Sequence, residues 1–307
     1  MSIICHGGAS GFLLKQLQEI EKKYPRNPTL NRLSQVYEYG IKKAIEKGQK
    51  LLNLNYPSDE IVVEVISVLE DNELFNAGKG CCFTENGKIE LDAIIVDWEK
   101  NYGAITLASN IKNPIQMAYQ LKNKFGMKMI GGDGLSSLLE EFEIKTENDE
   151  YFKSSVKNII NQEIRNVLKN IKYSTVGCVV MDLEGRIAAG TSTGGIMNKL
   201  WGRIGDSPIL GAGTYVEPLF GGISCTGTGE RFIKECVAYD ILARMKYQGV
   251  KMSESMREVF KGLPERSGGC IGIDKDGKSY AYFNSASMFY GYLENGKIYY
   301  GLEEKKY

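Results

Sequence analysis

The chain has 307 residues, 43% of them hydrophobic, which suffices for a large buried core. Its 38 Lys and Arg residues balance its 38 Asp and Glu residues, so no field of one sign attracts nucleic acid or an anionic membrane. No apolar run approaches the ~20 residues of a membrane span, and the N-terminal sequence has no basic n-region. The seven cysteines lack C-x-x-C spacing, as is typical of free thiols in a reducing compartment. We expect a single domain, 1–307, in a cytoplasmic protein.

The first half of the chain alternates strand and helix signals. Apolar residues between Leu33 and Ile45 recur at helical spacing, and Asp59 and Glu60 stand where the first turn of a second helix favours acidic residues. Asn-Gly at 86–87 predicts a hairpin turn. The expected elements are a strand at 2–5, a glycine turn at 6–9, a helix at 31–47 ended by Gly48, a helix at 58–69, a tight loop at 75–80, hairpin arms at 82–84 and 88–91, a strand at 93–96 and a helix starting at Pro114.

The composition changes between about residues 140 and 174, where Glu, Lys and Asn dominate and apolar periodicity is weak. Such a charged segment is either an exposed helix or a mobile linker. It ends just before Thr175.

The second half is expected to consist mainly of strands and turns. The expected elements are strands at 175–182 and 186–191, a glycine-rich region to Gly222, a strand at 223–225, a helix at 230–248 ended by Gly249, and strands at 270–273 and 280–283. Residues 272–279 fit the written P-loop pattern, but strand-like residues follow Ser279 where a phosphate-binding loop needs a helix. We therefore interpret 272–279 as a hairpin turn.

Thr175 opens the strand at 175–182, and two interpretations fit it. A β-branched residue at the start of a strand is ordinary. Alternatively, breakage of the preceding peptide bond would place a free α-amino group beside the threonine hydroxyl, where it serves as the base for a nucleophile.

Three clusters after Thr175 favour the second interpretation. Residues 191–195 (TSTGG) bring further hydroxyls among glycines. Residues 202–208 (GRIGDSP) contain Arg203 and Asp206, which form either a weak surface ion pair or a site for the carboxylate and ammonium of an amino acid. Residues 225–230 (CTGTGE) lie at a strand-to-helix junction, where a hydroxyl and a backbone N–H can hold an oxyanion.

In these residues and their order, the chain resembles the plant-type (type 2) asparaginase and isoaspartyl aminopeptidase family of N-terminal-nucleophile hydrolases. The resemblance spans nearly the whole chain in family order. The matching stretches are HGGA at 6–9, LFNAGKG at 74–80, ELDA at 90–93, TVG at 175–177, TSTGG at 191–195, NK at 198–199, GRIGDSP at 202–208, GAG at 211–213, TGTGE at 226–230 and FN at 283–284.

The resemblance implies an αββα four-layer sandwich with two stacked, mainly antiparallel sheets. It also implies a precursor that cleaves itself between Ser174 and Thr175 into an α subunit, 1–174, and a β subunit, 175–307. Family members typically form a dimer of such αβ units.

The same resemblance assigns roles to individual residues. Thr175 would be the nucleophile, oriented by Thr193, with Asn76 beside it. Arg203 and Asp206 would bind the α-carboxylate and α-ammonium of an L-aspartyl substrate, Thr226 and Gly227 would form the oxyanion hole, and Gly229 would line the substrate site. Catalysis would need no cofactor. A structural sodium ion would bind main-chain carbonyls of Leu69, Glu70, Phe75, Ala77 and Lys79.

The expected substrates are L-asparagine and β-aspartyl dipeptides, both hydrolysed to L-aspartate. Three alternatives remain open: a glycosylasparaginase, a threonine aspartase acting on proteins, and a precursor that stays uncleaved and is inert or binds a ligand. Family members usually have glycine or aspartate before the nucleophile, whereas this chain has Ser174.

Overall fold

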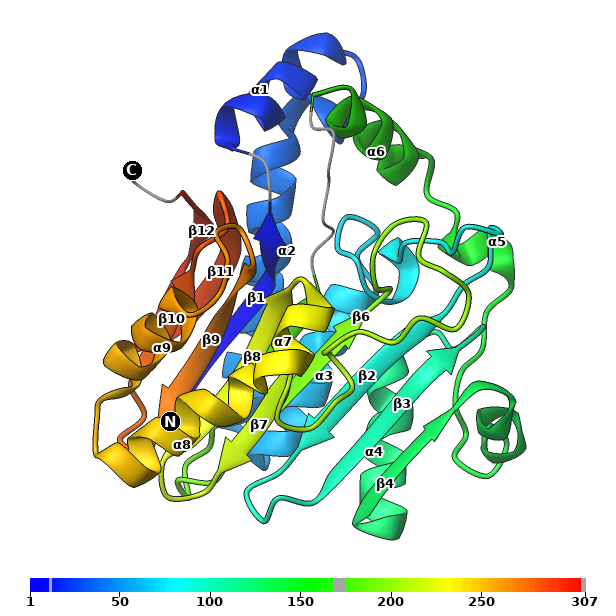
Figure 1. Cartoon of the computed structure of the whole chain (residues 1–307). Coiled ribbons are helices and arrows are strands. Elements are labelled where there is room, and N and C mark those ends of the chain that lie inside the picture. Colours follow the sequence, from blue (N-terminus) through cyan, green and yellow to red (C-terminus); the bar gives the residue numbers. More distant parts are fainter. Residues whose placement is uncertain (11–12, 168–174, 305–307) are drawn as a thin grey trace.

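The computed structural model describes residues 1–10, 13–167 and 175–304, and within these ranges two sheets pack face to face (Figure 1). The larger sheet has the strand order β12 (Lys297–Glu304), β11 (Ser287–Glu294), β1 (Ser2–Ser10), β5 (Val176–Met181), β6 (Ile187–Thr193), β2 (Leu91–Val96), β3 (Tyr102–Ala108), β4 (Met127–Gly131). The smaller sheet has the order β10 (Ser279–Phe283), β9 (Gly268–Asp274), β8 (Gly221–Gly227), β7 (Thr214–Glu217). Neighbouring strands are antiparallel except β3 and β4.

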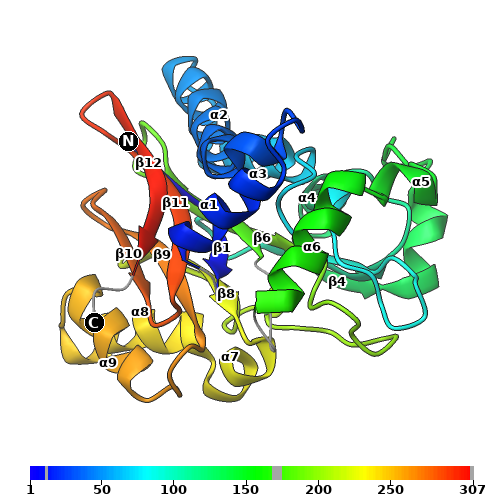
Figure 2. The ribbon, with the colours of Figure 1, turned by 90° about the horizontal axis from the view of Figure 1, so that it is seen from above.

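Helices cover the outer face of each sheet (Figures 1 and 2). The described helices are α1 (Leu14–Lys23), α2 (Leu33–Asn53), α3 (Ser58–Glu70), α4 (Pro114–Phe125), α5 (Asp149–Phe152), α6 (Ser155–Val167), α7 (Gly229–Glu235), α8 (Val237–Gln248) and α9 (Met252–Lys261), with short 3-10 turns η1 (Leu30–Arg32), η2 (Gly78–Gly80) and η3 (Gly132–Leu138). Helices α2, α3 and α4 pack on the larger sheet, and α8 and α9 pack on the smaller one. This is the predicted αββα sandwich. In the described ranges, no helix combines the length and apolar character that a membrane crossing requires.

Strand β5 is apolar throughout because both of its faces are buried. Val176, Cys178 and Val180 pack in the core beneath the helices of the larger sheet. Val179 and Met181 pack in the core between the two sheets. A strand presents successive side chains to opposite faces, so a strand covered on both sides loses the alternation of apolar and polar residues. The predicted strand at 175–182 is confirmed, and burial on both of its faces explains its apolar sequence.

Two predictions based on glycines were wrong: a turn at 6–9 and the end of a helix at Gly48. The glycine turn at 6–9 is part of β1, which has a bulge between His6 and Gly8. A Cβ at Gly7 would lie 2.3 Å from the Phe75 ring, so glycine permits close packing there. Gly48 does not end its helix, since α2 continues to Asn53. A Cβ at Gly48 would lie 2.7 Å from Ile3 Cδ1, so this glycine lets the helix approach the sheet.

The predicted helix at 230–248 is two helices in the structure. Cys236 adopts a left-handed conformation with φ of 46°, which separates α7 from α8. Gly249 ends α8 with φ of 69°, as predicted. Strand β7 lies inside the glycine-rich region for which no strand was predicted. It pairs with β8, which extends the predicted strand at 223–225 at both ends.

Several other predicted elements are present in the structure. The helices at 58–69 and from Pro114 are confirmed as α3 and α4. The Asn-Gly turn is confirmed, but its arms form only one isolated bridge, between Phe83 and Ile89. The P-loop-like stretch is a hairpin turn between β9 and β10, as interpreted. In the charged segment, α5 and α6 favour the helix interpretation up to residue 167, and residues 168–174 lie outside the described ranges.

Candidate active site

Thr175 lies immediately before β5, a strand flanked by β1 and β6 in the middle of the larger sheet. Its side chain is buried, and its Oγ1 donates a hydrogen bond to Thr193 Oγ1 at 3.0 Å. A second hydroxyl, Ser207 Oγ, lies 3.3 Å from the same atom. Two hydroxyls therefore fix the direction of the Thr175 hydroxyl.

The turn after β6 holds Thr193 in place. Thr193 Oγ1 accepts a hydrogen bond from Gly195 N at 3.0 Å. Asn76, from the loop after α3, donates to Gly195 O at 2.6 Å, and its own backbone oxygen accepts from Gly194 N. The structure thus brings Asn76, Thr193 and Thr175 together as the resemblance implies.

Ser207 contacts the Thr175 hydroxyl, although its sequence neighbours predict no role for it. It directly follows Asp206 in the 202–208 cluster and is almost completely buried. Its position next to Asp206 was the available signal, but serines beside glycines and prolines are also common in turns. Only the tertiary structure places its hydroxyl against Thr175.

Arg203 and Asp206 both lie close to the backbone of Gly229. Arg203 Nε donates to Glu230 Oε1 at 2.9 Å, at the start of α7. A Cβ at Gly229 would lie 2.8 Å from Arg203 Nη2 and 3.0 Å from Asp206 Oδ1, so the absence of a side chain at Gly229 makes room for both groups. Gly229 is therefore placed beside the two predicted substrate-binding residues.

Asp206 is a buried acid whose second oxygen, Oδ2, has no hydrogen-bond partner in the described part of the chain. Burial raises the pKa of its carboxyl to about 7, although its own backbone amide and the Arg203 guanidinium act in the opposite direction. A buried, incompletely paired carboxylate costs free energy unless something satisfies it. An incoming ammonium group would do so.

Thr226 and Gly227 end β8, just before α7. Thr226 Oγ1 accepts a hydrogen bond from Ala9 N at 3.2 Å. Because a hydroxyl both donates and accepts, this contact leaves the proton of Thr226 to donate elsewhere. Ala9 lies near the end of β1 that runs beside the start of β5, so Thr226 reaches the same end of the sandwich as Thr175.

His6, the single histidine of the chain, makes a hydrogen bond with the backbone of Thr175, whereas the partners of Thr175 Oγ1 in the described residues are Thr193 and Ser207. His6 is fully buried, and burial lowers its pKa to about 3. Its Nε2 lies 3.2 Å from Ser224 Oγ, inside the sandwich. The ring is therefore neutral at physiological pH.

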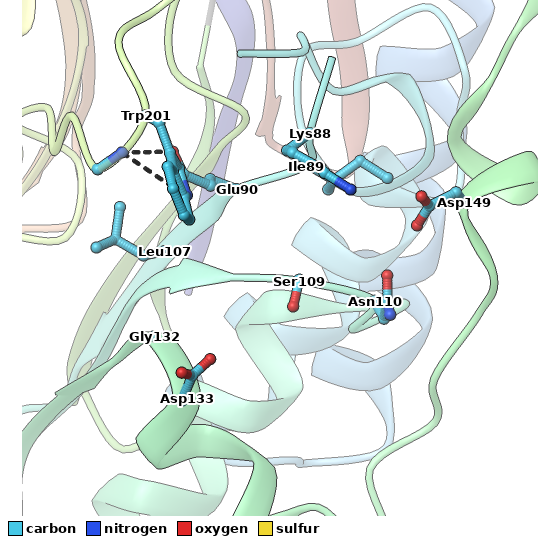
Figure 3. Close-up of a pocket in the computed structure, with 11 residues that line it drawn as sticks. Lys88, Ile89, Glu90, Leu107, Ser109, Asn110, Gly132, Asp133, Asp149 and Trp201 are labelled. Atoms are coloured by element: carbon cyan, nitrogen blue, oxygen red, sulfur yellow. Dashed lines mark hydrogen bonds between the residues drawn. The ribbon is translucent and has the colours of Figure 1, made fainter. Parts of the chain in front are cut away.

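A separate cavity of ≈ 590 Å³ opens next to the 202–208 cluster (Figure 3). Its wall includes Glu90, the exposed Trp201 and Gly202, but not Thr175, Thr193 or Thr226. This cavity adjoins the loop that carries Arg203 and is not lined by Thr175.

Comparisons with known proteins extend over nearly the whole chain. The family model described as asparaginase matches residues 3–302. The isoaspartyl peptidase of Escherichia coli (strain K12) is 34% identical over 304 residues, covering 94% of this chain and 91% of that protein. The probable isoaspartyl peptidase/L-asparaginase 2 of Arabidopsis thaliana is 34% identical, covering 82% and 87%. The isoaspartyl peptidase/L-asparaginase of Danio rerio is 30% identical, covering 98% and 94%.

Proposed function

The chain belongs to the asparaginase family, and from this premise we propose that it hydrolyses L-asparagine and β-aspartyl dipeptides to L-aspartate. The observation that carries the proposal is the buried Thr175 hydroxyl, directed by Thr193 at the start of a central strand. The nearby Arg203 and Asp206 offer complementary charges for the carboxylate and ammonium of an amino acid.

The proposed mechanism begins with cleavage between Ser174, which lies outside the described residues, and Thr175. Cleavage gives Thr175 a free α-amino group, which takes the hydroxyl proton as the hydroxyl attacks the side-chain amide carbon of the substrate. The Thr226 hydroxyl and Gly227 N–H stabilise the oxyanion. The α-ammonium group of Thr175 returns the proton to the leaving nitrogen, so that ammonia or an amino acid departs. Water then hydrolyses the aspartyl ester and regenerates Thr175.

Substrate selection in this mechanism rests on the amino acid head group. Arg203 would bind the α-carboxylate, and the incompletely paired Asp206 would bind the α-ammonium. Neither contact constrains the group that leaves. This supports activity on asparagine and on β-aspartyl dipeptides alike.

We also propose that the end of α3 and the loop that follows it hold a structural sodium ion through the carbonyls of Leu69, Glu70, Phe75, Ala77 and Lys79. A Cβ at Gly78 would lie 2.6 Å from Glu70 O, and one at Gly80 would lie 2.1 Å from Phe75 O. The loop therefore folds tightly around main-chain oxygens, the ligand type that hard cations prefer. Bound there, the ion would rigidify the loop that carries Asn76.

Two further properties are part of the proposal. A dimer of cleaved αβ units follows the pattern of the family. A reducing, cytoplasmic location is supported by free cysteines, of which Cys5, Cys178, Cys225 and others are buried in the described ranges.

The experiment that tests the function is intact-mass spectrometry of the purified protein during days at 37 °C, combined with assays on three substrates. We expect two fragments, the smaller starting at Thr175, and release of aspartate from asparagine and from a β-aspartyl dipeptide. Release from glycosylated asparagine alone would favour the glycosylasparaginase alternative. A single uncleaved species without hydrolysis would favour an inert precursor, with Ser174→Gly as the next variant.

A further inference from the structure

Lys199 is a fully buried lysine near the active site. Its Nζ donates to Glu90 O at 2.7 Å and lies 3.9 Å from Glu90 Oε2, and the Glu90 side chain is itself almost completely buried. Burying a lysine and a glutamate is costly unless they are paired and hydrogen-bonded. The mechanism proposed above uses neither residue, so the pair needs another explanation.

The carboxylate of Glu90 binds the backbone directly before Arg203. Gly202 N lies 3.0 Å from Glu90 Oε1 and 3.1 Å from Oε2, and Figure 3 shows both contacts in the wall of the cavity. Gly202 has φ of 84°, a conformation that favours glycine and turns the chain sharply. Glu90 therefore fixes the turn from which the Arg203 side chain projects.

The other end of the same arrangement supports the nucleophile. The Lys199 side chain lies against Gly195, where a Cβ would come within 2.9 Å of Lys199 Cδ and 3.1 Å of its Nζ. Gly195 N is the donor to Thr193 Oγ1, which in turn receives the bond from Thr175. One buried side chain thus contacts the turn that orients the nucleophile.

We propose that Lys199 and Glu90 are positioning residues that hold the Arg203 turn and the Thr193–Gly195 turn at a fixed separation. The inference rests on the proposed function, because it assigns Arg203 to the substrate head group and Thr175 to the reaction. Neither Lys199 nor Glu90 contacts the substrate. They set the distance between the site that binds the α-carboxylate and the hydroxyl that attacks the side-chain amide.

The test compares Lys199→Met, Glu90→Ala and Glu90→Gln with a matched control, Lys122→Met. Lys122 is also a buried lysine, paired with Asp59 at 2.8 Å and Asp97 at 3.1 Å, but none of these residues belongs to the proposed site. For each variant one measures the Tm, the Kd for L-aspartate by calorimetry, and KM and kcat for asparagine.

We expect Lys199→Met and Glu90→Ala to raise Kd and KM about tenfold, since each removes hydrogen bonds to a charged group. Glu90→Gln keeps an acceptor for Gly202 N and should have a smaller effect. Lys122→Met should lower the Tm and leave Kd and KM unchanged.

A purely structural role for Lys199 would lower the Tm as in Lys122→Met without changing Kd or KM, and this result would overturn the inference. If Lys199→Met does not fold, Glu90→Ala, which removes the acceptor for Gly202 N, decides in the same way. A wild-type protein that neither hydrolyses asparagine nor binds L-aspartate would instead contradict the proposed function itself, and the inference with it.

Discussion

Two groups of buried hydroxyls lie between the sheets and have the same chemistry but different surroundings. The first, which we call the nucleophile group, consists of Thr175, Thr193 and Ser207. The second, the core group, consists of Thr191, Thr214 and Ser224, and His6 lies beside it. In the core group, Thr191 Oγ1 bonds to Ser224 Oγ at 2.7 Å and also to Thr214, and Ser224 contacts His6.

Each group takes one of its residues from the same strand, β6. Thr191 and Thr193 are two positions apart on β6, so they face the same way, toward the smaller sheet. Ser192, between them, faces the helices and donates to Glu70 at 2.6 Å. Thr193 belongs to the nucleophile group because it is level with the start of β5, whereas Thr191 is paired with Gly177, farther along that strand.

The core group fills space that a side chain would otherwise occupy. A Cβ at Gly177 would lie 2.0 Å from Ser224 Oγ and 2.5 Å from His6 Nε2. Glycine at this position is therefore required for the Ser224 hydroxyl to contact the His6 ring. The two groups thus differ in position and not in chemistry: under the proposed function, the nucleophile group lies at the start of β5, beside the bond proposed to be cleaved, whereas the core group lies farther along the strand.

The strongest test of this comparison replaces one hydroxyl in each group. Thr175→Ala should abolish both self-cleavage and hydrolysis, a loss of about 10⁴-fold or more, because the attacking atom is gone. Ser224→Ala should lower the Tm and leave a cleaved, active enzyme. Intact-mass spectrometry and aspartate release measure the two outcomes. Cleavage and activity in Thr175→Ala would show that the wrong residue has been assigned.

A subtler pair is Thr193→Val and Thr191→Val, two positions apart on one strand. Thr193→Val should lower kcat about 100-fold, since Thr175 Oγ1 loses the acceptor that orients it while Gly195 N loses its partner. Thr191→Val should reduce stability with kcat changed less than about threefold. Equal losses of kcat in both variants would mean that the two groups act as one network.

The groups also differ in the titratable residue beside them, Asp206 for one and His6 for the other. Because burial raises the pKa of Asp206 to about 7, the carboxylate that attracts the substrate ammonium is neutralised as the pH falls below 7. KM for asparagine should therefore rise about fivefold between pH 7 and pH 6, because the ionised fraction of a group with a pKa near 7 falls by about that factor. In Asp206→Asn, KM should be high and independent of pH in this range; a pH-dependent KM there would point to another group.

The smallest effect on catalysis is expected at His6, whose titration should affect stability instead. Burial lowers its pKa to about 3, against 6.5 in the unfolded chain, so the unfolded state binds more protons between these values. The contribution of His6 to stability is complete above pH 6.5 and is lost as the pH falls. From pH 6.5 to 5 the wild type should lose about 2 kcal/mol relative to His6→Gln. Denaturant unfolding at several pH values measures this difference, and parallel curves would contradict it.

Much of the local structure could be predicted from the sequence, because it depends on neighbouring residues. The acidic first turn of α3, the proline that opens α4 and the Asn-Gly turn are short-range signals, and the structure contains all three. The order of the clusters around Thr175, Arg203 and Thr226 could also be recognised in the sequence. The resemblance that rests on this order agrees with the match to the asparaginase family.

The remaining features depend on residues far apart in the chain. Gly7 and Gly48 lie where a helix or an aromatic ring approaches the sheet, and nothing in their neighbours distinguishes such a contact from a turn. Ser207 meets Thr175 across 32 positions, and Lys199 meets Glu90 across 109. Composition and periodicity describe what each segment prefers by itself. Which buried hydroxyl faces the start of β5, and which lysine is enclosed beside it, follows only from how the two sheets pack together.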